Sequence, residues 1–349
     1  MRRTLASATA AVATRTTGRR TIHAAASTRA AAPTDAPAAT HTQRDDSQYI
    51  LRTYARQPIE LVRGEGVWLW DASGRRFLDF HSGIAVNSLG HSHPAWVAAV
   101  QSQAVVLTHT SNLFFSAPQT ALAKQLIEMS EGSFDKVFFC NSGTEATEAA
   151  IKFTRKYQLV RAREKAAAEI KQFESAEKQA ARPHSKLDLI AFKGGFHGRS
   201  MGALSLTSKW PYRGPFAPLL DNVHFLPFND SGAVAATVGP NTAGLFVEPI
   251  QGEGGVHPAR ADFLAACRET TRRHDALLVI DEVQAGLSRT GSTIAHKHAF
   301  VSGGGKFGKL DADIMTLAKP LAGGLPIGAV LLKQKVADCL QRQCRHART

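Results

Sequence analysis

Two ionisable side chains in this chain each follow a strongly apolar run. Asp281 comes directly after residues 276–280. Lys319 comes directly after residues 314–318. A charge at the end of a buried strand is costly unless it has a partner, so one interpretation is a structural ion pair between the two. The other is catalytic, because a lysine in a dry pocket loses proton affinity and becomes an amine nucleophile.

A polar loop offers a place for an anion. Asn141-Ser142-Gly143-Thr144-Glu145 stands between an apolar run and a helical stretch. Glycine lets the backbone approach a ligand closely, and a helix N-terminus presents free N–H groups. The hydroxyls of Ser142 and Thr144 add donors, although the same residue types cap helices that bind nothing. With an aromatic candidate at Phe196, the lysine, the carboxylate and a phosphate anchor are the set that pyridoxal phosphate requires.

These groups need a scaffold that brings strand ends together. From about residue 118, short apolar runs alternate with helical stretches, which predicts an α/β fold with a mostly parallel sheet flanked by helices. The expected strands are residues 137–140, 189–192, 245–247, 277–280 and 314–318. Polar or glycine-rich clusters follow them, beginning at Asn141, Lys193, Glu248, Asp281 and Lys319. Ligands of open α/β sheets bind outside the carboxyl ends of the strands, so we expect one shared site.

Residues 49–100 have a different pattern. Two short apolar runs, residues 67–70 and 77–80, flank a turn signal, which predicts a hairpin in a small N-terminal subdomain. His91 and His93 follow, and no third metal-ligating residue stands near them. A turn is therefore favoured over a metal site, and we expect no metal.

The formal charge of +13 over 349 residues raises the question of a nucleic-acid partner. Residues 1–34 contain six arginines and no acidic residue, which is typical of a mitochondrial transit peptide, although a basic tail with no address has the same composition. Residues 333–349 carry a further +4, so residues 35–332 carry only +3. The charge therefore argues for an import signal, followed by a polar linker at residues 35–48, and not for a nucleic-acid surface.

Other classes are excluded by pattern. No run approaches the roughly 20 apolar residues of a membrane-spanning helix, and the four cysteines lack the spacing of a disulfide scaffold or a zinc site. Residues 303–310 fit Gly-x-x-x-x-Gly-Lys, but Leu310 stands where a nucleotide-binding loop has Ser or Thr. A surface loop is favoured there.

Five motifs together resemble the class III pyridoxal-phosphate-dependent aminotransferases, and among them the mitochondrial branch that acts on N-acetylornithine. The motifs are Phe138-Phe139-Cys140-Asn141-Ser142-Gly143-Thr144-Glu145-Ala146, Phe196-His197-Gly198-Arg199, Val247-Glu248-Pro249-Ile250-Gln251-Gly252-Glu253-Gly254, Asp281-Glu282-Val283-Gln284 and Leu317-Ala318-Lys319-Pro320-Leu321-Ala322-Gly323-Gly324. The resemblance runs from about Tyr49 to Leu340. It implies a fold type I transferase, with the N-terminal part of a small domain at residues 49–100 and a large cofactor domain at residues 101–332.

The resemblance also assigns roles to residues. It places cofactor contacts at Ser142, Gly143, Thr144, Phe196, His197, Asp281, Glu282, Val283, Gln284 and Lys319, and substrate contacts at Arg199, Glu248 and Glu253. Lys319 is expected to form the Schiff base and to move the reacting proton, with Asp281 on the pyridine nitrogen. Arg199 is expected to bind a substrate carboxylate with its planar fork. Glu253 is expected to help the site accept both substrates.

The implied reaction moves the δ-amino group of N-acetylornithine to 2-oxoglutarate, giving N-acetylglutamate semialdehyde and glutamate, by a homodimer in the mitochondrial matrix. Ornithine, 4-aminobutyrate and succinyl-diaminopimelate enzymes of the class are alternatives. Family members continue well beyond the strand expected at residues 327–332. Residues 333–349 do not resemble that region, so we expect an aberrant tail and an incomplete small domain, which leaves a non-catalytic remnant as a second hypothesis.

Overall fold

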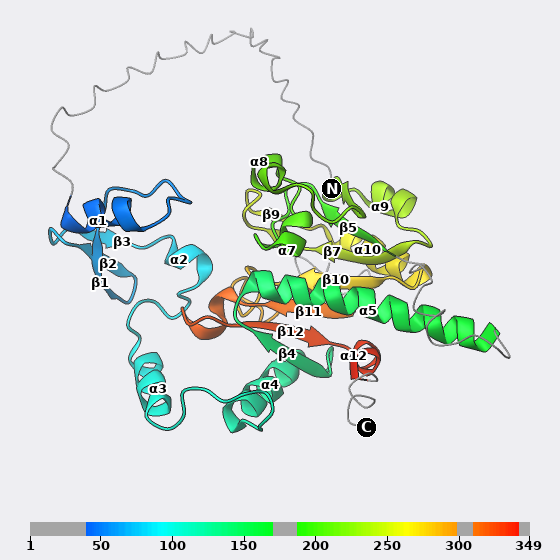
Figure 1. Cartoon of the computed structure of the whole chain (residues 1–349), viewed down its shortest axis with the longest axis horizontal. Helices are drawn as coiled ribbons and strands as arrows, with labels where there is room; N and C mark the ends of the chain where they lie inside the picture. The colour runs from blue at the N-terminus through cyan, green and yellow to red at the C-terminus, as the bar shows by residue number, and fades with distance from the viewer. Residues whose placement is uncertain (1–39, 170–186, 299–309, 342–349) are drawn as a thin grey trace, which may run out of the picture. The chain divides into compact units, whose positions relative to one another are not determined.

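The computed structural model describes residues 40–169, 187–298 and 310–341 (Figure 1). The chain forms two units, Met1–Glu60 and Leu61–Thr349. The domain boundaries expected at residues 48 and 100 stay predictions. The expected transit peptide and residues 303–309 of the glycine-rich loop lie outside the described residues.

Part of the predicted linker is helical. Helix α1, His41–Tyr49, begins at Thr40, whose side-chain oxygen accepts a hydrogen bond from the Gln43 N–H at 3.2 Å. The Gln43 side chain accepts in return from the Thr40 N–H at 3.0 Å. This reciprocal capping box satisfies two helix-end donors, so the polar composition of residues 35–48 concealed a helix start.

A small antiparallel sheet opens the second unit. Its strands pair in the order β1 (Leu61–Glu65), β2 (Trp68–Asp71), β3 (Arg76–Leu78). The Asp71 carboxylate closes the β2–β3 turn by accepting from the N–H groups of Ser73 and Arg75. The predicted hairpin is confirmed, with β1 as an additional strand.

The central sheet has seven strands in the order β4-β12-β11-β10-β7-β5-β6. The strands are β4 (Lys136–Cys140), β5 (Asp188–Phe192), β6 (Val223–Leu226), β7 (Thr242–Val247), β10 (Leu277–Asp281), β11 (Ile314–Leu317) and β12 (Gly328–Leu332). Only β12 is antiparallel to its neighbours, β11 and β4. The other pairs are parallel. All predicted strands are therefore confirmed, and the mostly parallel sheet with them.

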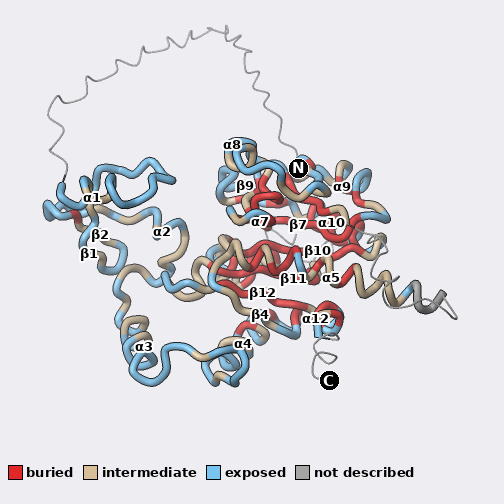
Figure 2. The backbone as a smooth tube through the Cα atoms, in the orientation of Figure 1, coloured by how far each residue is buried: buried red, intermediate tan, exposed pale blue. Residues whose placement is uncertain are grey.

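Helices cover both faces of this sheet (Figures 1 and 2). The helices and remaining short strands of the second unit are α2 (Ser82–Ala85), α3 (Pro94–Ala104), α4 (Ala117–Met129), α5 (Gly143–Glu169), α7 (Met201–Ser205), α8 (Trp210–Arg213), η1 (Gly214–Phe216), α9 (Ser231–Thr237), β8 (Ile250–Gln251), β9 (His257–Pro258), α10 (Ala261–Arg273), η2 (Ala295–Lys297), η4 (Lys319–Ala322) and α12 (Gln334–Gln341). Residues of α4, α9 and α10 share one apolar cluster with alternate strand residues such as Leu278 and Ile280. Residues of α5 and α12 share the other, with Leu277 and Val279. Because both faces are covered, β7 and β10 are buried along their whole length.

The predicted aberrant tail begins as part of the fold. Helix α12 buries Val336, Ala337 and Cys339 against the α5 side of the sheet. The Lys335 ammonium lies 2.7 Å from Asp313, a fully buried carboxylate that also pairs with Arg268 at 2.7 Å. Residues 334–341 therefore belong to the core, because their apolar side chains recur at helical spacing. Residues 342–349 lie outside the described part of the chain.

In the part of the chain that the structure describes, no helix is both long enough and apolar enough to span a membrane.

Candidate active site

The carboxyl ends of five parallel strands meet at one edge of the central sheet. The clusters after β4, β5, β7, β10 and β11 lie along this edge because these strands run in the same direction. Strand β12 runs the other way, so its first residue, Gly328, is brought to the same edge beside Cys140. The topology therefore gathers residues that are up to about 180 positions apart in the sequence, as the rule for open sheets predicts.

Three groups of the chain hold the Asp281 carboxylate at this edge. Its Oδ2 lies 2.7 Å from His197 Nδ1, and its Oδ1 accepts from the Val283 N–H at 3.0 Å. The Thr316 hydroxyl also donates to Oδ1, at 3.1 Å. Asp281 and Thr316 are register partners on β10 and β11. The carboxylate is thus buried and fixed in orientation, which is the condition for placing a charge against a ligand atom.

His197 and Glu248 complete a buried acid–base group around Asp281. Burial alone would lower the pKa of His197, but the hydrogen bond and charge of Asp281 outweigh it and raise that pKa. Burial raises the pKa of Glu248 to about 7, aided by the charge of Asp281 and opposed by those of His197 and Lys319. Glu248 Oε2 accepts from the Phe196 N–H at 3.0 Å and so anchors the backbone that carries His197.

Lys319 begins the η4 turn immediately after β11 and is partly buried. Burial lowers its pKa, and the charges of Asp281, Glu248 and Glu253 oppose this without cancelling it. A lower pKa increases the fraction of free amine, which is the reactive form of a lysine. The geometry therefore places an activated lysine in electrostatic reach of Asp281. Among the described residues, the Asp281 carboxylate contacts His197 and Thr316, and it forms no direct ion pair with the Lys319 ammonium.

The N-terminus of α5 presents the expected anion-binding groups in a specific way. The Ser142 hydroxyl accepts from the Glu145 N–H at 3.2 Å, and the Glu145 carboxylate accepts from the Asn141 N–H at 2.7 Å. Ser142 therefore caps helix α5, which is one of its two predicted roles, the other being to donate to an anion. Thr144 pairs with Ser200 through their hydroxyls at 2.7 Å. Among the described residues no acceptor is recorded for the N–H groups of Gly143 and Thr144, which leaves both at the helix end where an anion binds.

Two glycines make this edge compact. A Cβ on Gly143 would lie 2.7 Å from Val283 and 3.4 Å from Ala318, so the α5 N-terminus packs against both the aspartate motif and the lysine motif. Gly198 has φ +130°, and a Cβ there would lie 2.4 Å from Thr144 Oγ1. Free helix N–H groups, a buried carboxylate and an activated lysine thus converge, and this donor set fits a phosphorylated pyridine aldehyde.

Glu282 does not belong to this group. It is fully buried on the opposite side of β10 from Asp281, because successive strand residues point to opposite faces. Its carboxylate accepts from the Ala295 and His296 N–H groups at 2.8 Å each and lies 2.5 Å from His296 Nδ1. The Glu282 side chain thus anchors the loop before η2, and the cofactor contact expected at this residue stays a prediction.

Gln284 lies against another motif of the edge. Its Oε1 approaches Gly252 so closely that a Cβ at Gly252 would lie 1.7 Å away. Gln251, beside Gly252, donates from Nε2 to the Lys193 carbonyl at 3.1 Å. The clusters after β5, β7 and β10 are therefore in direct contact, as the prediction of a shared site requires.

Arg199 and Glu253 lie at the rim of the same edge and are exposed. The Arg199 guanidinium lies 4.7 Å from the Tyr212 ring centroid and 5.9 Å from that of Phe196. The Tyr212 hydroxyl donates to Glu253 Oε1 at 2.9 Å. The Lys209 ammonium lies 3.4 Å from the same oxygen. The rim thus carries a guanidinium and a carboxylate, both held by one tyrosine.

Two residues with evident roles were not predicted. Thr316 is a hydroxyl inside an apolar run three positions before Lys319, a polar exception that could have been noticed. Tyr212 follows Lys209 and Trp210 in a segment with no motif, so nothing in the sequence marked it. Both act through tertiary contacts with predicted residues.

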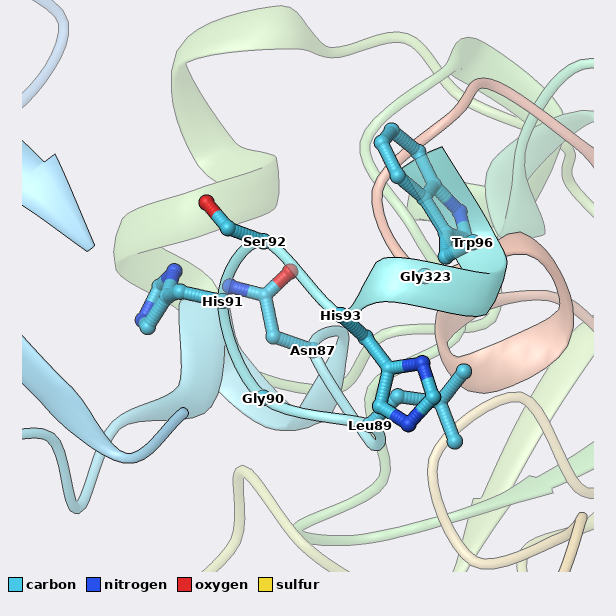
Figure 3. Close-up of a pocket in the computed structure, with 8 residues that line it drawn as sticks. All are labelled: Asn87, Leu89, Gly90, His91, Ser92, His93, Trp96 and Gly323. Atoms are coloured by element: carbon cyan, nitrogen blue, oxygen red, sulfur yellow. The ribbon is translucent and has the colours of Figure 1, made fainter. Parts of the chain in front are cut away.

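A separate pocket lies beside the turn that follows Lys319 (Figure 3). It is lined by Asn87, Leu89, Gly90, His91, Ser92, His93, Trp96 and Gly323. Trp96 donates from Nε1 to the Ala322 carbonyl at 2.9 Å, which ties this wall to η4. His91 Nε2 lies 2.7 Å from Asp79, and the chain turns at Ser92 as predicted. None of the predicted site residues lines this pocket.

The family described as "Aminotransferase class-III" matches residues 49–349. Over 292 residues the chain is 48% identical to the mitochondrial acetylornithine aminotransferase of Alnus glutinosa, covering 83% of this chain and 58% of that protein. It is 41% identical over 295 residues to the acetylornithine aminotransferase of Methanocaldococcus jannaschii, covering 84% of this chain and 66% of that protein. The chain thus spans about three fifths of the length of these relatives.

Solved structures agree with the sequence relatives. An ornithine aminotransferase from Toxoplasma gondii, described as having partial occupancy of PLP at its active site, matches with a TM-score of 0.72 and 32% identity, covering 85% of this chain and 63% of that chain. An N-acetylornithine aminotransferase from Stenotrophomonas maltophilia matches with a TM-score of 0.64 and 39% identity, covering 84% of this chain and 66% of that chain.

Proposed function

Because the chain belongs to the class III aminotransferase family, we propose that it transfers the δ-amino group of N-acetylornithine to 2-oxoglutarate. The products are N-acetylglutamate semialdehyde and glutamate. The observation that carries this proposal is the buried Asp281–His197 pair at 2.7 Å beside a lysine of lowered pKa, on a fold shared with enzymes named for this activity.

Pyridoxal 5′-phosphate is the cofactor of this family, and the sheet edge fits it. When bound, it supplies an aldehyde that accepts the amino group and a ring that withdraws electrons from the reacting carbon. In the proposed site the N–H groups of Gly143 and Thr144 hold the phosphate, and Asp281 holds the pyridine nitrogen. Phe196 is the proposed ring contact, and Gln284 is proposed to face the phenolic oxygen.

The chain's own residues account for the proton chemistry that we propose. Burial lowers the pKa of Lys319 and so increases the fraction present as free amine, the form that can take a proton from the substrate carbon and return it. His197, Thr316 and the Val283 N–H hold the Asp281 carboxylate in one orientation, from which it would pair with the pyridine nitrogen.

Substrate choice is proposed to rest on the rim. Arg199 offers a planar fork suited to a carboxylate, and both N-acetylornithine and 2-oxoglutarate carry one. The relatives with the highest identities given above are named for acetylornithine, which favours this donor over ornithine. The ornithine aminotransferase among the similar structures makes ornithine the competitor to measure.

Location and assembly are proposals of the same kind. Mitochondrial relatives from Alnus glutinosa and Dictyostelium discoideum, together with the arginine-rich residues 1–34, support import into the mitochondrial matrix. We also propose that the chain forms a homodimer.

The test is glutamate formation by the purified chain from N-acetylornithine and 2-oxoglutarate. Ornithine, 4-aminobutyrate and N-succinyl-diaminopimelate are compared at equal concentration, and we expect N-acetylornithine to have the highest kcat/KM. Visible absorbance on adding pyridoxal phosphate, lost in Lys319→Ala, is the expected sign of cofactor binding. No turnover together with no absorbance change would establish the non-catalytic alternative.

A further inference from the structure

Tyr212 stands at the centre of the exposed rim and contacts each charged group there. The Arg199 guanidinium lies 4.7 Å from its ring centroid and the Lys209 ammonium 4.8 Å. Phe196 meets the same ring edge-on, with centroids 6.3 Å apart and planes at 84°. Two cations and one aromatic ring therefore share a single tyrosine, an arrangement that fixes the ring's position.

The hydroxyl end of Tyr212 holds the opposite charge. It donates to Glu253 Oε1 at 2.9 Å, and Lys209 lies 3.4 Å from the same oxygen. The Tyr212 hydrogen bond is the main cause that lowers the pKa of Glu253, and the Arg199 charge contributes. Because both side chains of the Lys209–Glu253 pair are exposed, the pair contributes little free energy by itself. The Tyr212 hydroxyl is therefore the more specific restraint on Glu253.

We propose that Tyr212 is a positioning residue that holds Arg199 by its ring and Glu253 by its hydroxyl, and so prevents the carboxylate from competing with substrate for the guanidinium. The inference rests on the proposed function of Arg199 as the carboxylate-binding residue. Arg199 and Glu253 carry opposite charges within electrostatic reach. A released Glu253 would approach Arg199, and an incoming carboxylate would have to displace it.

A released Glu253 should affect the binding of the two substrates differently. A dicarboxylate such as 2-oxoglutarate is attracted by Arg199 and repelled by a mobile Glu253. N-acetylornithine has a single carboxylate and a terminal amine, so Glu253 repels it less. Loss of the Tyr212 hydroxyl should therefore raise KM for 2-oxoglutarate more than KM for N-acetylornithine, with kcat changed less than twofold.

The binding test uses glutarate, a dicarboxylate that cannot be transaminated, titrated by calorimetry into the full chain loaded with pyridoxal phosphate. Tyr212→Phe removes one hydrogen bond to a charged group, and we expect glutarate to bind roughly 3- to 10-fold more weakly. In a Glu253→Gln background the same substitution should change glutarate affinity by less than about 1.5-fold, because the competing charge is gone. Tyr212→Leu should weaken binding in both backgrounds, because it also removes the ring from Arg199.

The control is Tyr157→Phe, which removes a hydroxyl from a tyrosine buried on α5 about 21 Å along the helix from Gly143. It should leave glutarate affinity unchanged. An equal loss for Tyr212→Phe in both backgrounds, or no loss in either, would overturn the inference. If the unsubstituted chain turns over N-acetylornithine and KM for 2-oxoglutarate is unmoved in Tyr212→Phe, the inference fails while the proposed function stands. If the unsubstituted chain neither binds glutarate nor turns over, both fail.

Discussion

Two acid–base pairs lie at the same sheet edge and differ in burial. His197 and Asp281 are 2.7 Å apart and almost fully buried, whereas Lys209 and Glu253 are 3.4 Å apart and exposed. Losing a partner costs more free energy for a buried charge than for an exposed one, because no water takes the partner's place. An exposed pair is screened by water and contributes little.

The comparison separates two tasks. The buried group of Asp281, His197, Glu248 and Thr316 can hold fixed charges for a reaction that is the same for every substrate. The rim of Arg199, Tyr212 and Glu253 can adjust to substrates that differ in charge, since its side chains reach solvent. Burial thus assigns each residue to one of the two groups, and substitutions can test that assignment.

The largest effect is expected for Lys319→Ala. Removing the only amine placed beside Asp281 in the described site should reduce turnover roughly 10³-fold or more. Glutarate binding at the rim should change less than twofold. Lys209→Ala, which removes an exposed lysine of the rim, is the matched control and should retain kcat. Residual activity of Lys319→Ala within tenfold of the unsubstituted chain would refute the role of this lysine.

Asp281→Asn should reduce kcat by about 10²-fold, because the amide keeps the shape but loses the charge that faces His197 and that we propose to hold the pyridine nitrogen. The N–H of Val283 and the hydroxyl of Thr316 can still donate to the remaining oxygen, so the fold should survive. Asp262→Asn breaks a surface pair with Arg260 of 3.1 Å and should leave kcat unaltered. Steady-state kinetics of both variants, with thermal unfolding as a folding check, decides the matter.

Glu248→Gln should reveal the buried group through pH. The pKa of Glu248 in the folded chain is about 7, above its ordinary 4.5, so its contribution to stability is fully present below pH 4.5 and is lost as pH rises through 7. The neutral amide does not suffer this loss. The free energy of unfolding of the variant relative to the parent should therefore increase by about 2–3 kcal/mol between pH 5 and pH 8.

Glu253→Gln provides the rim counterpart of that measurement. The pKa of Glu253 is lowered, chiefly by the Tyr212 hydrogen bond, so any stability it contributes is present above its ordinary pKa and lost only at acid pH. Denaturant unfolding between pH 5 and pH 8 should show no growing difference from the parent. Parallel pH curves for both glutamate variants would contradict the contrast in burial.

The smallest effect on kcat is expected for Arg199→Lys. The lysine keeps the charge but loses the planar fork, so KM for 2-oxoglutarate should rise about tenfold with kcat within twofold. This split between KM and kcat identifies an interaction made equally in the ground and transition states. Equal losses in kcat and kcat/KM would instead show that Arg199 acts in the transition state, as we expect of the buried group and not of the rim.

Local sequence patterns were sufficient for the scaffold. Apolar runs of strand length predicted five of the six parallel strands and the clusters that follow them, because burial on both faces of a sheet leaves a continuous apolar signature. Strand β6 was not predicted. The lysine and aspartate were predicted from their positions after such runs. The helix start at Thr40 and the core helix at residues 334–341 were missed, although a capping box and helical apolar spacing mark them.

The contacts around those residues were decided only by the tertiary structure. Which oxygen of Asp281 meets His197, why Glu282 turns to the other face, and how Tyr212 comes between Arg199 and Glu253 depend on residues far apart in the chain. Sequence periodicity records whether a position is buried, because each residue carries its own hydrophobicity. It does not record which partner it meets there, because partners are set by strand order and register. The sequence thus determined that a lysine and a carboxylate each follow a buried strand, and the fold determined that the two strands are neighbours and how each side chain is held.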